Sequence, residues 1–94
     1  MKNHLKEYYS NLFKTPLNKE SLGKKEDVGK RLKECRLGCG LSQRDVARIM
    51  GVAQPVYQRF EKGIFECSYS QLVMLCIIFD ETADYLLGIK KYGE

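Results

Sequence analysis

The residues Gln43–Lys62, QRDVARIMGVAQPVYQRFEK, decide the fold of this chain. They predict two short helices joined by a tight turn, because Gly51 can adopt the positive φ that such a turn requires. Ala47 provides the small side chain that two helices need where they cross at a steep angle. The apolar residues of the stretch are expected to be buried, and they are Val46, Met50, Val52, Tyr57 and Phe60. The pair of helices therefore has one buried side and one exposed side.

Capping residues mark the ends of these two helices. Ser42 is a good N-cap for the first helix. Asp45 lies in its first turn, where a negative carboxylate stabilises the positive end of the helix dipole. The second helix is expected over Gln54–Lys62. Pro55 falls in its first turn, where a missing N–H costs nothing, and Gly63 ends it. Two short helices around a turn of three or four residues form the helix-turn-helix motif.

Further helices are expected on both sides of the motif, and no stretch alternates like a strand. Before the motif, a helix starts near Glu26 and ends at Gly38, with its apolar residues on one face. After it, Ser70–Asp80 is apolar nearly all round. Thr82 can cap a last helix, Ala83–Leu87, which Gly88 ends. The sequence therefore predicts an all-α fold.

The N-terminal residues form a segment of their own. The stretch His4–Phe13 predicts a helix with one apolar stripe, whose residues are Leu5, Tyr8, Tyr9, Leu12 and Phe13. Pro16 ends this helix, because the residue before a proline avoids helical geometry. Leu17–Glu26 is polar and is interpreted as a linker. We therefore expect an amphipathic helix and linker over residues 1–26 and a helix-turn-helix domain over residues 27–94.

Several separated motifs resemble those of one family. They are VGKRLKECR (Val28–Arg36), GLSQRDVARIMGV (Gly40–Val52), YQRFEKG (Tyr57–Gly63) and DYLLG (Asp84–Gly88). In this order they look like the phage-repressor, or Cro-like, helix-turn-helix family, also called the XRE family. The resemblance implies a five-helix lambda-repressor-like bundle, here with an extra N-terminal helix. It also implies a sequence-specific DNA-binding transcriptional regulator, expected to be a repressor that binds a palindromic operator in double-stranded DNA as a homodimer.

The same resemblance implies roles for individual residues. Contacts to DNA bases fall on Gln54, Pro55, Gln58 and Arg59. Contacts to DNA phosphates fall on Gln43, Arg44 and Lys62. Arg36 and Glu61 stand where the family typically has a salt bridge between the first helix and the recognition helix. The chemistry of the side chains agrees, because Gln can pair with adenine and Arg with guanine through two hydrogen bonds. Tyr57 departs from the usual aliphatic residue, so its hydroxyl needs a hydrogen-bond partner or water.

Length and charge leave two alternatives open. A chain of 94 residues with 44% hydrophobic residues forms one domain with a small core. Its net charge of +4 is concentrated in residues 1–26, which hold six lysines and three glutamates, so residues 27–94 are nearly neutral. The motif could therefore be two ordinary amphipathic helices of a bundle. The fold could also serve as a protein–protein interaction module, such as an antitoxin-like or regulatory partner.

No enzymatic or metal-dependent chemistry is expected. The only histidine, His4, has no obvious acidic partner, and a glycine-rich phosphate loop is absent. Cys35 and Cys39 have the spacing of one zinc-ligand pair. Cys67 and Cys76 do not form a second pair, so reduced thiols are expected instead of zinc. We expect no cofactor and no small-molecule substrate.

The chain is expected to act in the cytoplasm. No apolar run approaches the eighteen residues that indicate a membrane-spanning helix. The first residues lack the apolar core and the cleavage site of a secretory signal.

The apolar character of Ser70–Asp80 predicts an interface. Leu72, Leu75, Cys76 and Phe79 are enough to face the core, which leaves other apolar residues to be covered. We expect the N-terminal helix to pack on Val73, Ile77 and their neighbours, either within one chain or across a dimer. The alternative is a flexible basic arm that touches DNA.

Overall fold

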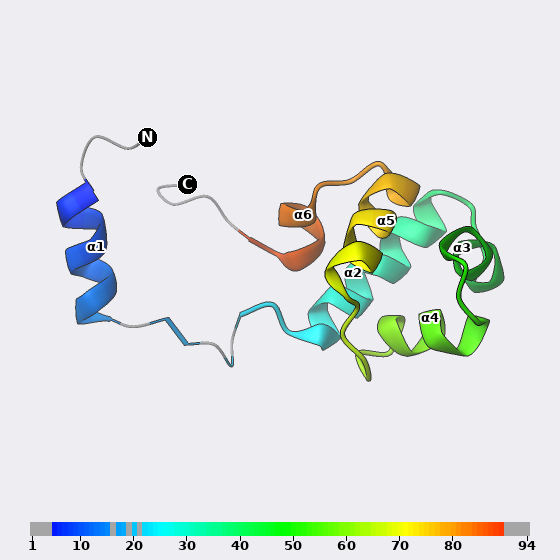
Figure 1. The fold of residues 1–94 in the computed structure, drawn as a ribbon, viewed down its shortest axis with the longest axis horizontal. Coiled ribbons are helices and arrows are strands. Elements are labelled where there is room, and N and C mark those ends of the chain that lie inside the picture. Colours follow the sequence, from blue (N-terminus) through cyan, green and yellow to red (C-terminus); the bar gives the residue numbers. More distant parts are fainter. Residues whose placement is uncertain (1–4, 16, 19, 21, 90–94) are drawn as a thin grey trace.

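Helices make up most of the part of the chain that the computed structural model describes, residues 5–15, 17–18, 20 and 22–89 (Figure 1). In chain order they are α1 (Leu5–Lys14), α2 (Lys25–Gly38), α3 (Gln43–Met50), α4 (Gln54–Glu61), α5 (Tyr69–Phe79) and α6 (Ala83–Leu87). The described residues contain no strand, so the predicted all-α fold is confirmed. Within these residues, every helix is too short or too polar to cross a membrane.

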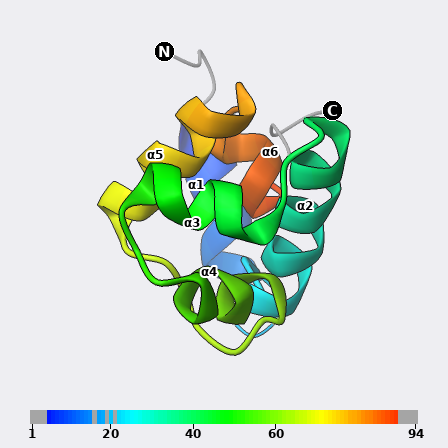
Figure 2. The same cartoon turned by 90° about the vertical axis from the view of Figure 1, so that its right-hand side faces the viewer.

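Helices α2–α6 pack into a bundle around one apolar core (Figure 2). Helix α4 lies against both α2 and α3, while α5 lies against α3 and α6. The core side chains come from all five helices and are Val28, Leu32, Val46, Ala47, Met50, Tyr57, Phe60, Leu75, Phe79 and Leu86. This is the expected five-helix bundle, with α1 as the extra N-terminal helix.

The first turn of α3 is fixed by the predicted cap. The Ser42 hydroxyl accepts a hydrogen bond from the Asp45 N–H at 3.0 Å. The Asp45 carboxylate accepts one in return from the Ser42 N–H at 2.9 Å. Two backbone donors that a helix start leaves unpaired are thus satisfied by side chains. At the other end, Gly51 ends α3 with a φ of 75°, as the turn requires.

Helix α5 begins one residue earlier than the sequence predicted. Its N-cap is Ser68, whose hydroxyl accepts a hydrogen bond from the Gln71 N–H at 3.2 Å. The Gln71 side chain accepts one from the Ser68 N–H at 2.8 Å. This capping box places Tyr69 in the helix instead of the preceding loop. Asp80 does not continue the helix but ends it in the left-handed conformation, with a φ of 51°.

A glycine that the sequence analysis did not single out allows α2 to approach α4. Gly29 is buried in the first half of α2. A Cβ atom added to it would lie only 2.6 Å from the carbonyl oxygen of Phe60. Because that oxygen belongs to the α4 backbone, it cannot move aside as a flexible side chain would. Only glycine therefore fits at this contact, and it brings the two helices together at the base of the motif.

Helix α1 lies apart from the bundle (Figure 1). Its Tyr8 faces an open apolar hollow of about 650 Å³ that is also lined by Leu17, Leu22 and residues 87–89. Val73 and Ile77 on α5 stay exposed, with 58% and 75% of their surface accessible. The structure therefore does not have the intrachain packing of the N-terminal helix on α5. The side chain of Leu5 and all of His4 lie outside the described residues.

Candidate functional site

Helices α3 and α4 form the helix-turn-helix, and α4 presents its outer side to solvent. Val46, Ala47 and Tyr57 hold the pair together from the buried side. The residues predicted to contact bases all lie on α4: Gln54, Pro55 and Arg59 are exposed and Gln58 is half-buried. They recur at spacings of one and four residues, so one face of the helix carries them. Pro55 lies in the first turn of α4, as predicted.

An open hollow lies where the N-terminal ends of α3 and α4 meet. It has a volume of about 500 Å³ and is lined by Arg36, Ser42, Gln43, Arg44 and Gln54. The structure thus brings two of the predicted phosphate-contacting residues together with one of the predicted base-contacting residues. The third predicted phosphate contact, Lys62, is exposed at the C-terminal cap of α4 and does not line this hollow.

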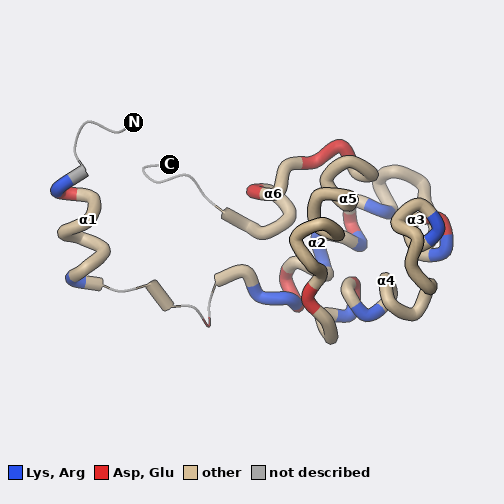
Figure 3. The backbone as a smooth tube through the Cα atoms, in the orientation of Figure 1, with Lys and Arg blue, Asp and Glu red and all other residues tan. Residues whose placement is uncertain are grey.

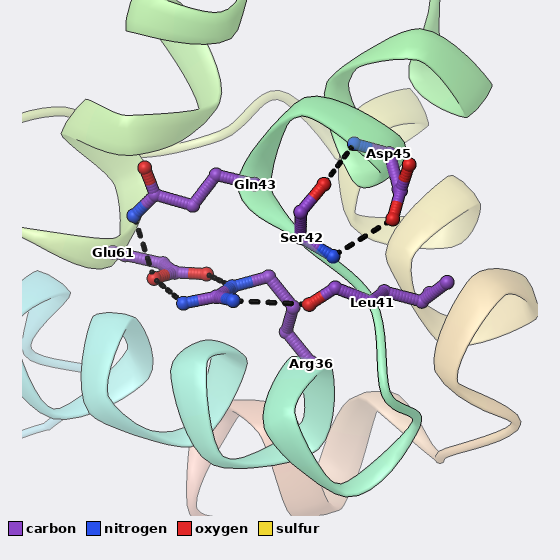
Figure 4. A network of polar contacts seen from close by, with 6 residues as sticks. All are labelled: Arg36, Leu41, Ser42, Gln43, Asp45 and Glu61. Atoms are coloured by element: carbon purple, nitrogen blue, oxygen red, sulfur yellow. Dashed lines mark hydrogen bonds and ion pairs between the residues drawn. The ribbon is translucent and has the colours of Figure 1, made fainter.

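The predicted ion pair between Arg36 and Glu61 is present and buried (Figure 4). Arg36 Nε lies 2.7 Å from Glu61 Oε2, and Arg36 Nη2 donates to Glu61 Oε1 at 3.1 Å. Arg36 Nη1 also donates to the Leu41 carbonyl oxygen at 3.0 Å. The Gln43 amide joins the network by donating to Glu61 Oε1 at 3.1 Å. These hydrogen bonds therefore connect α2, α3 and α4 beside the hollow, which Arg36 and Gln43 themselves line.

This network has a second consequence for Gln43. Its side chain was predicted to contact a DNA phosphate, but one of its two N–H groups is already used within the protein. A primary amide has two N–H donors, so the second remains for a ligand. The hydrogen bond to Glu61 holds the amide at the rim of the hollow, which prepares it for such a contact.

The ionisation of the buried pair follows from its contacts. Burial alone would raise the pKa of Glu61, but its contacts with Arg36, Tyr57 and Gln43 outweigh it, and the pKa lies below its usual value. The pKa of Arg36 is raised, mainly by its hydrogen bond to Glu61. Both groups are therefore charged at neutral pH. Burial, followed by the nearby Glu61 carboxylate, raises the pKa of Tyr57.

The Tyr57 hydroxyl is a polar group that is buried in the core and makes no hydrogen bond among the described residues. Tyr57 is fully buried, and its hydroxyl meets no hydrogen-bond partner among the described residues. The sequence predicted that this hydroxyl would need a partner or water. Since the ring itself packs edge-on against Phe60, with the centroids 6.4 Å apart, the side chain contributes through its apolar part.

An aromatic residue in the loop after α4 contacts this helix. The Arg59 guanidinium lies over the ring of Phe65, 5.4 Å from its centroid. The Arg59 carbonyl oxygen also accepts hydrogen bonds from the N–H groups of Ile64 and Phe65, at 3.0 and 3.4 Å. The loop after α4 is thus tied to Arg59 at both the backbone and the side chain. An aromatic residue six positions after an arginine is a weak sequence signal, so only the fold reveals the contact.

Charge is distributed unevenly over the bundle (Figure 3). The exposed basic side chains of the helix-turn-helix are Arg44, Arg48, Arg59 and Lys62. Its two acidic residues are both held within the protein, Asp45 in the cap and Glu61 in the ion pair. Residues 64–89, in contrast, hold four acidic residues and no lysine or arginine. The helix-turn-helix and α2 therefore carry the positive charge of a nearly neutral domain, and residues 64–89 carry the negative charge.

The cysteines do not form a ligand site in the structure. All four are free, with Cys39 exposed and the other three partly buried. Among the described residues, no three His, Cys, Asp or Glu side chains come close enough to hold a metal ion. Burial raises the pKa of Cys35, Cys67 and Cys76, which keeps these thiols protonated.

Comparison with known proteins links this geometry to one family. A helix-turn-helix family model matches residues 32–86. The HTH-type transcriptional regulator AnsR of Bacillus subtilis is 38% identical over 61 residues, which cover 65% of this chain and 53% of AnsR. The uncharacterized HTH-type transcriptional regulator YqaE of the same organism is 38% identical over 56 residues, covering 60% of this chain and 48% of YqaE. The chain thus spans about half the length of these relatives.

A solved structure supports the same assignment. The restriction-modification controller protein C.AhdI of Aeromonas hydrophila superimposes with a TM-score of 0.62 and 27% sequence identity, covering 66% of this chain and 94% of that protein. The matched family is one of transcriptional regulators and is not an enzyme family. Because the family model covers more than half of the residues, the resemblance seen in the sequence is confirmed: the chain belongs to the helix-turn-helix family.

Proposed function

We propose that this chain is a sequence-specific DNA-binding transcriptional regulator that inserts α4 into the major groove. The observation that supports this most directly is the row of exposed polar residues on α4, next to a hollow rimmed by Gln43 and Arg44. A helix fits the major groove, and its exposed side chains can reach base edges there. The names of the matched relatives, which are transcriptional regulators, agree with this function.

Each residue predicted to contact DNA has a chemical role in this proposal. Gln54, Gln58 and Arg59 hydrogen-bond to base edges, with glutamine suited to adenine and arginine to guanine. Pro55 has no side-chain donor, so its contact is apolar, for example with a thymine methyl group. The phosphate contacts that fix the position of the protein on DNA fall on Gln43, Arg44 and Lys62.

The proposal includes a homodimer on a palindromic operator, acting as a repressor in the cytoplasm. A domain this small has a single recognition helix, which contacts only a few base pairs. Two copies related by a two-fold axis place two such helices about one DNA turn apart and double the site that is read. The matched relatives are bacterial, and a bacterial genome lies in the cytoplasm, so the proposal places this chain there too.

Protein–protein interaction is the second candidate function, and one observation favours it. The exposed side chains of residues 64–89 include four carboxylates and several large apolar groups, which suits a protein partner better than DNA. The two functions can coexist, because this face and the helix-turn-helix use different helices.

A binding measurement with duplex DNA separates the two functions. In vitro site selection with the purified chain is expected to enrich one palindromic sequence. Binding to random duplex is expected at low salt and to weaken steeply as the salt concentration rises, because phosphate contacts release counterions. Absence of binding at both salt concentrations, and no enriched sequence, would overturn DNA binding and leave the interaction module.

A further inference from the structure

Helix α5 carries a stripe of exposed apolar side chains along its length. Tyr69, Val73 and Ile77 follow one another at intervals of four residues, so they lie on one face of the helix. Their accessible fractions are 93%, 58% and 75%. Met74, beside them, is 40% accessible. A helix that is apolar on the core side and on the solvent side is normally covered on both, so this stripe marks an interface.

The charges around the stripe define what can cover it. The exposed acidic residues Glu66, Asp80, Glu81 and Asp84 surround the two ends of α5, and residues 64–89 contain no basic residue. Lys25 lies beside Glu66 and Tyr69 at one end of the stripe, but the four carboxylates outnumber it, so a surface of DNA phosphates is a poor occupant. The occupant is therefore apolar in its centre and basic at its ends.

Helix α1 has these properties. Its Tyr9 and Phe13 lie one turn apart and are 50% and 83% accessible. Lys6 and Lys14 are exposed near the two ends of the same helix. At a rise of about 1.5 Å per residue, the α5 stripe is roughly 12 Å long and α1 roughly 15 Å, so α1 is long enough to cover the stripe. Residues 1–26, with six lysines and three glutamates, also complement the acidic face in net charge.

Within its own chain, α1 does not use this surface. It lies beyond the end of α6, and its Tyr9 and Phe13 side chains stay exposed there. The α5 stripe and the outer face of α1 are thus both exposed in a single copy of the chain. In a two-fold dimer each could fill the other, because any contact made by one copy is repeated by its partner.

We propose that α1 of one copy packs on the Tyr69–Val73–Ile77 face of a second copy, reciprocally, and that this exchange forms the homodimer. The inference rests on the homodimer of the proposed function and identifies its surface. Tyr9 and Phe13 enter the apolar stripe, while Lys6 and Lys14 approach the carboxylates at the ends of α5. The stripe lies outside the helix-turn-helix, which leaves α4 free for DNA.

Cross-linking between two differently marked copies tests this arrangement without DNA. One copy carries Phe13→Cys and the other, with an affinity tag, carries Ile77→Cys; both carry Cys39→Ser to remove the exposed native thiol. Mild oxidation of the mixture is expected to give a covalent dimer that contains one copy of each. The control replaces Ile77→Cys with Leu37→Cys, another exposed apolar position, on α2 at 59% accessibility, and is expected to give none.

The outcomes decide between the possible arrangements. A covalent dimer in the Phe13–Ile77 mixture, but not in the control, supports the exchange. No covalent dimer, or equal amounts in both mixtures, overturns it. A chain that carries both substitutions and closes on itself, while the mixture gives no dimer, assigns the helix to packing within one chain and also overturns it.

Sedimentation equilibrium gives an independent measure. Ile77→Lys and deletion of residues 1–18 are each expected to raise the dimer dissociation constant by about tenfold or more, whereas Leu37→Lys leaves it unchanged. Circular dichroism checks that the variants remain folded. An unchanged dimer dissociation constant in both Ile77→Lys and the deletion variant would rule out the exchange. Since neither measurement involves DNA, failure of this interface and failure of DNA binding are distinguished.

Discussion

The Arg36 guanidinium and the Glu61 carboxylate form a buried two-point ion pair, with Nε 2.7 Å from Oε2 and Nη2 3.1 Å from Oε1. The two residues are 25 positions apart and belong to α2 and α4. Gln43 of α3 donates to the same carboxylate. The orientation of the helix-turn-helix relative to α2 therefore depends on one carboxylate that three helices share.

Removing either partner of this pair is expected to destabilise the domain strongly. Arg36→Ala or Glu61→Ala each leaves an unpaired charge in a buried site, which costs about 3–5 kcal/mol. The double replacement is expected to cost less than the sum of the two, because no unpaired charge remains. Urea unfolding of the four proteins of this cycle measures the coupling. Strict additivity would mean that the pair contributes nothing as a pair.

The pair also predicts how stability depends on pH. The pKa of Glu61 is lowered in the folded state, so its contribution is complete above the unfolded value of 4.5 and is lost as the pH falls through the lower folded value. The difference in unfolding free energy between the wild type and Glu61→Gln is therefore expected to be constant above about pH 5 and to shrink below about pH 4.5. Chemical unfolding at a series of pH values measures this difference. A difference that grows in acid would contradict the lowered pKa.

The buried Tyr57 hydroxyl predicts an unusually tolerant core substitution. The hydroxyl lies near the Arg36–Glu61 pair but makes no hydrogen bond among the described residues, so Tyr57→Phe removes a buried polar group that is only weakly compensated. The variant is expected to be as stable as the wild type or more stable. Tyr57→Ala is the control and is expected to cost about 3–5 kcal/mol, because it empties the same space. A loss of more than about 1 kcal/mol in Tyr57→Phe would show that the hydroxyl makes a hydrogen bond after all.

The contact between Arg59 and Phe65 predicts a change in DNA sequence preference. Arg59→Ala is expected to cost about 1–3 kcal/mol on the best site and to relax the preference at one base pair. Phe65→Leu removes the ring under the guanidinium, so it is expected to relax the same position with a smaller loss of affinity. Phe65→Tyr keeps a ring and is expected to restore the preference. Site selection with each variant measures this, and Gln43→Ala, which weakens all sites alike, is the control.

The close approach at Gly29 predicts opposite effects of one substitution at two glycines of α2. Gly29→Ala places a methyl group against the α4 backbone and is expected to cost about 1–3 kcal/mol or more. Gly38→Ala has open space around the new methyl group and replaces a poor helix former, so it is expected to be neutral or to stabilise by up to about 1 kcal/mol. Thermal unfolding measures both. Equal effects would mean that helix propensity, not the α2–α4 contact, governs Gly29.

Local signals in the sequence were enough to predict the helices and the motif. Caps such as Ser42 and stops such as Gly51 act within a few residues of the chain, so their signals are local and the structure confirms them. The exposed residues of α4 could also be located, because a helix that buries one face must expose the other. The partnership of Arg36 and Glu61 came only from the family resemblance, since spacing alone does not pair residues 25 positions apart.

Contacts between residues that are distant in the sequence could be seen only in the folded chain. Gly29 has no local signal, because the backbone that excludes a side chain there belongs to α4, about thirty residues later. Phe65 became a neighbour of Arg59 only when the loop after α4 folded back on it. The position of α1 was also beyond the sequence. An apolar stripe predicts that a helix packs against a partner. Which partner it packs against depends on surfaces that only the folded bundle presents.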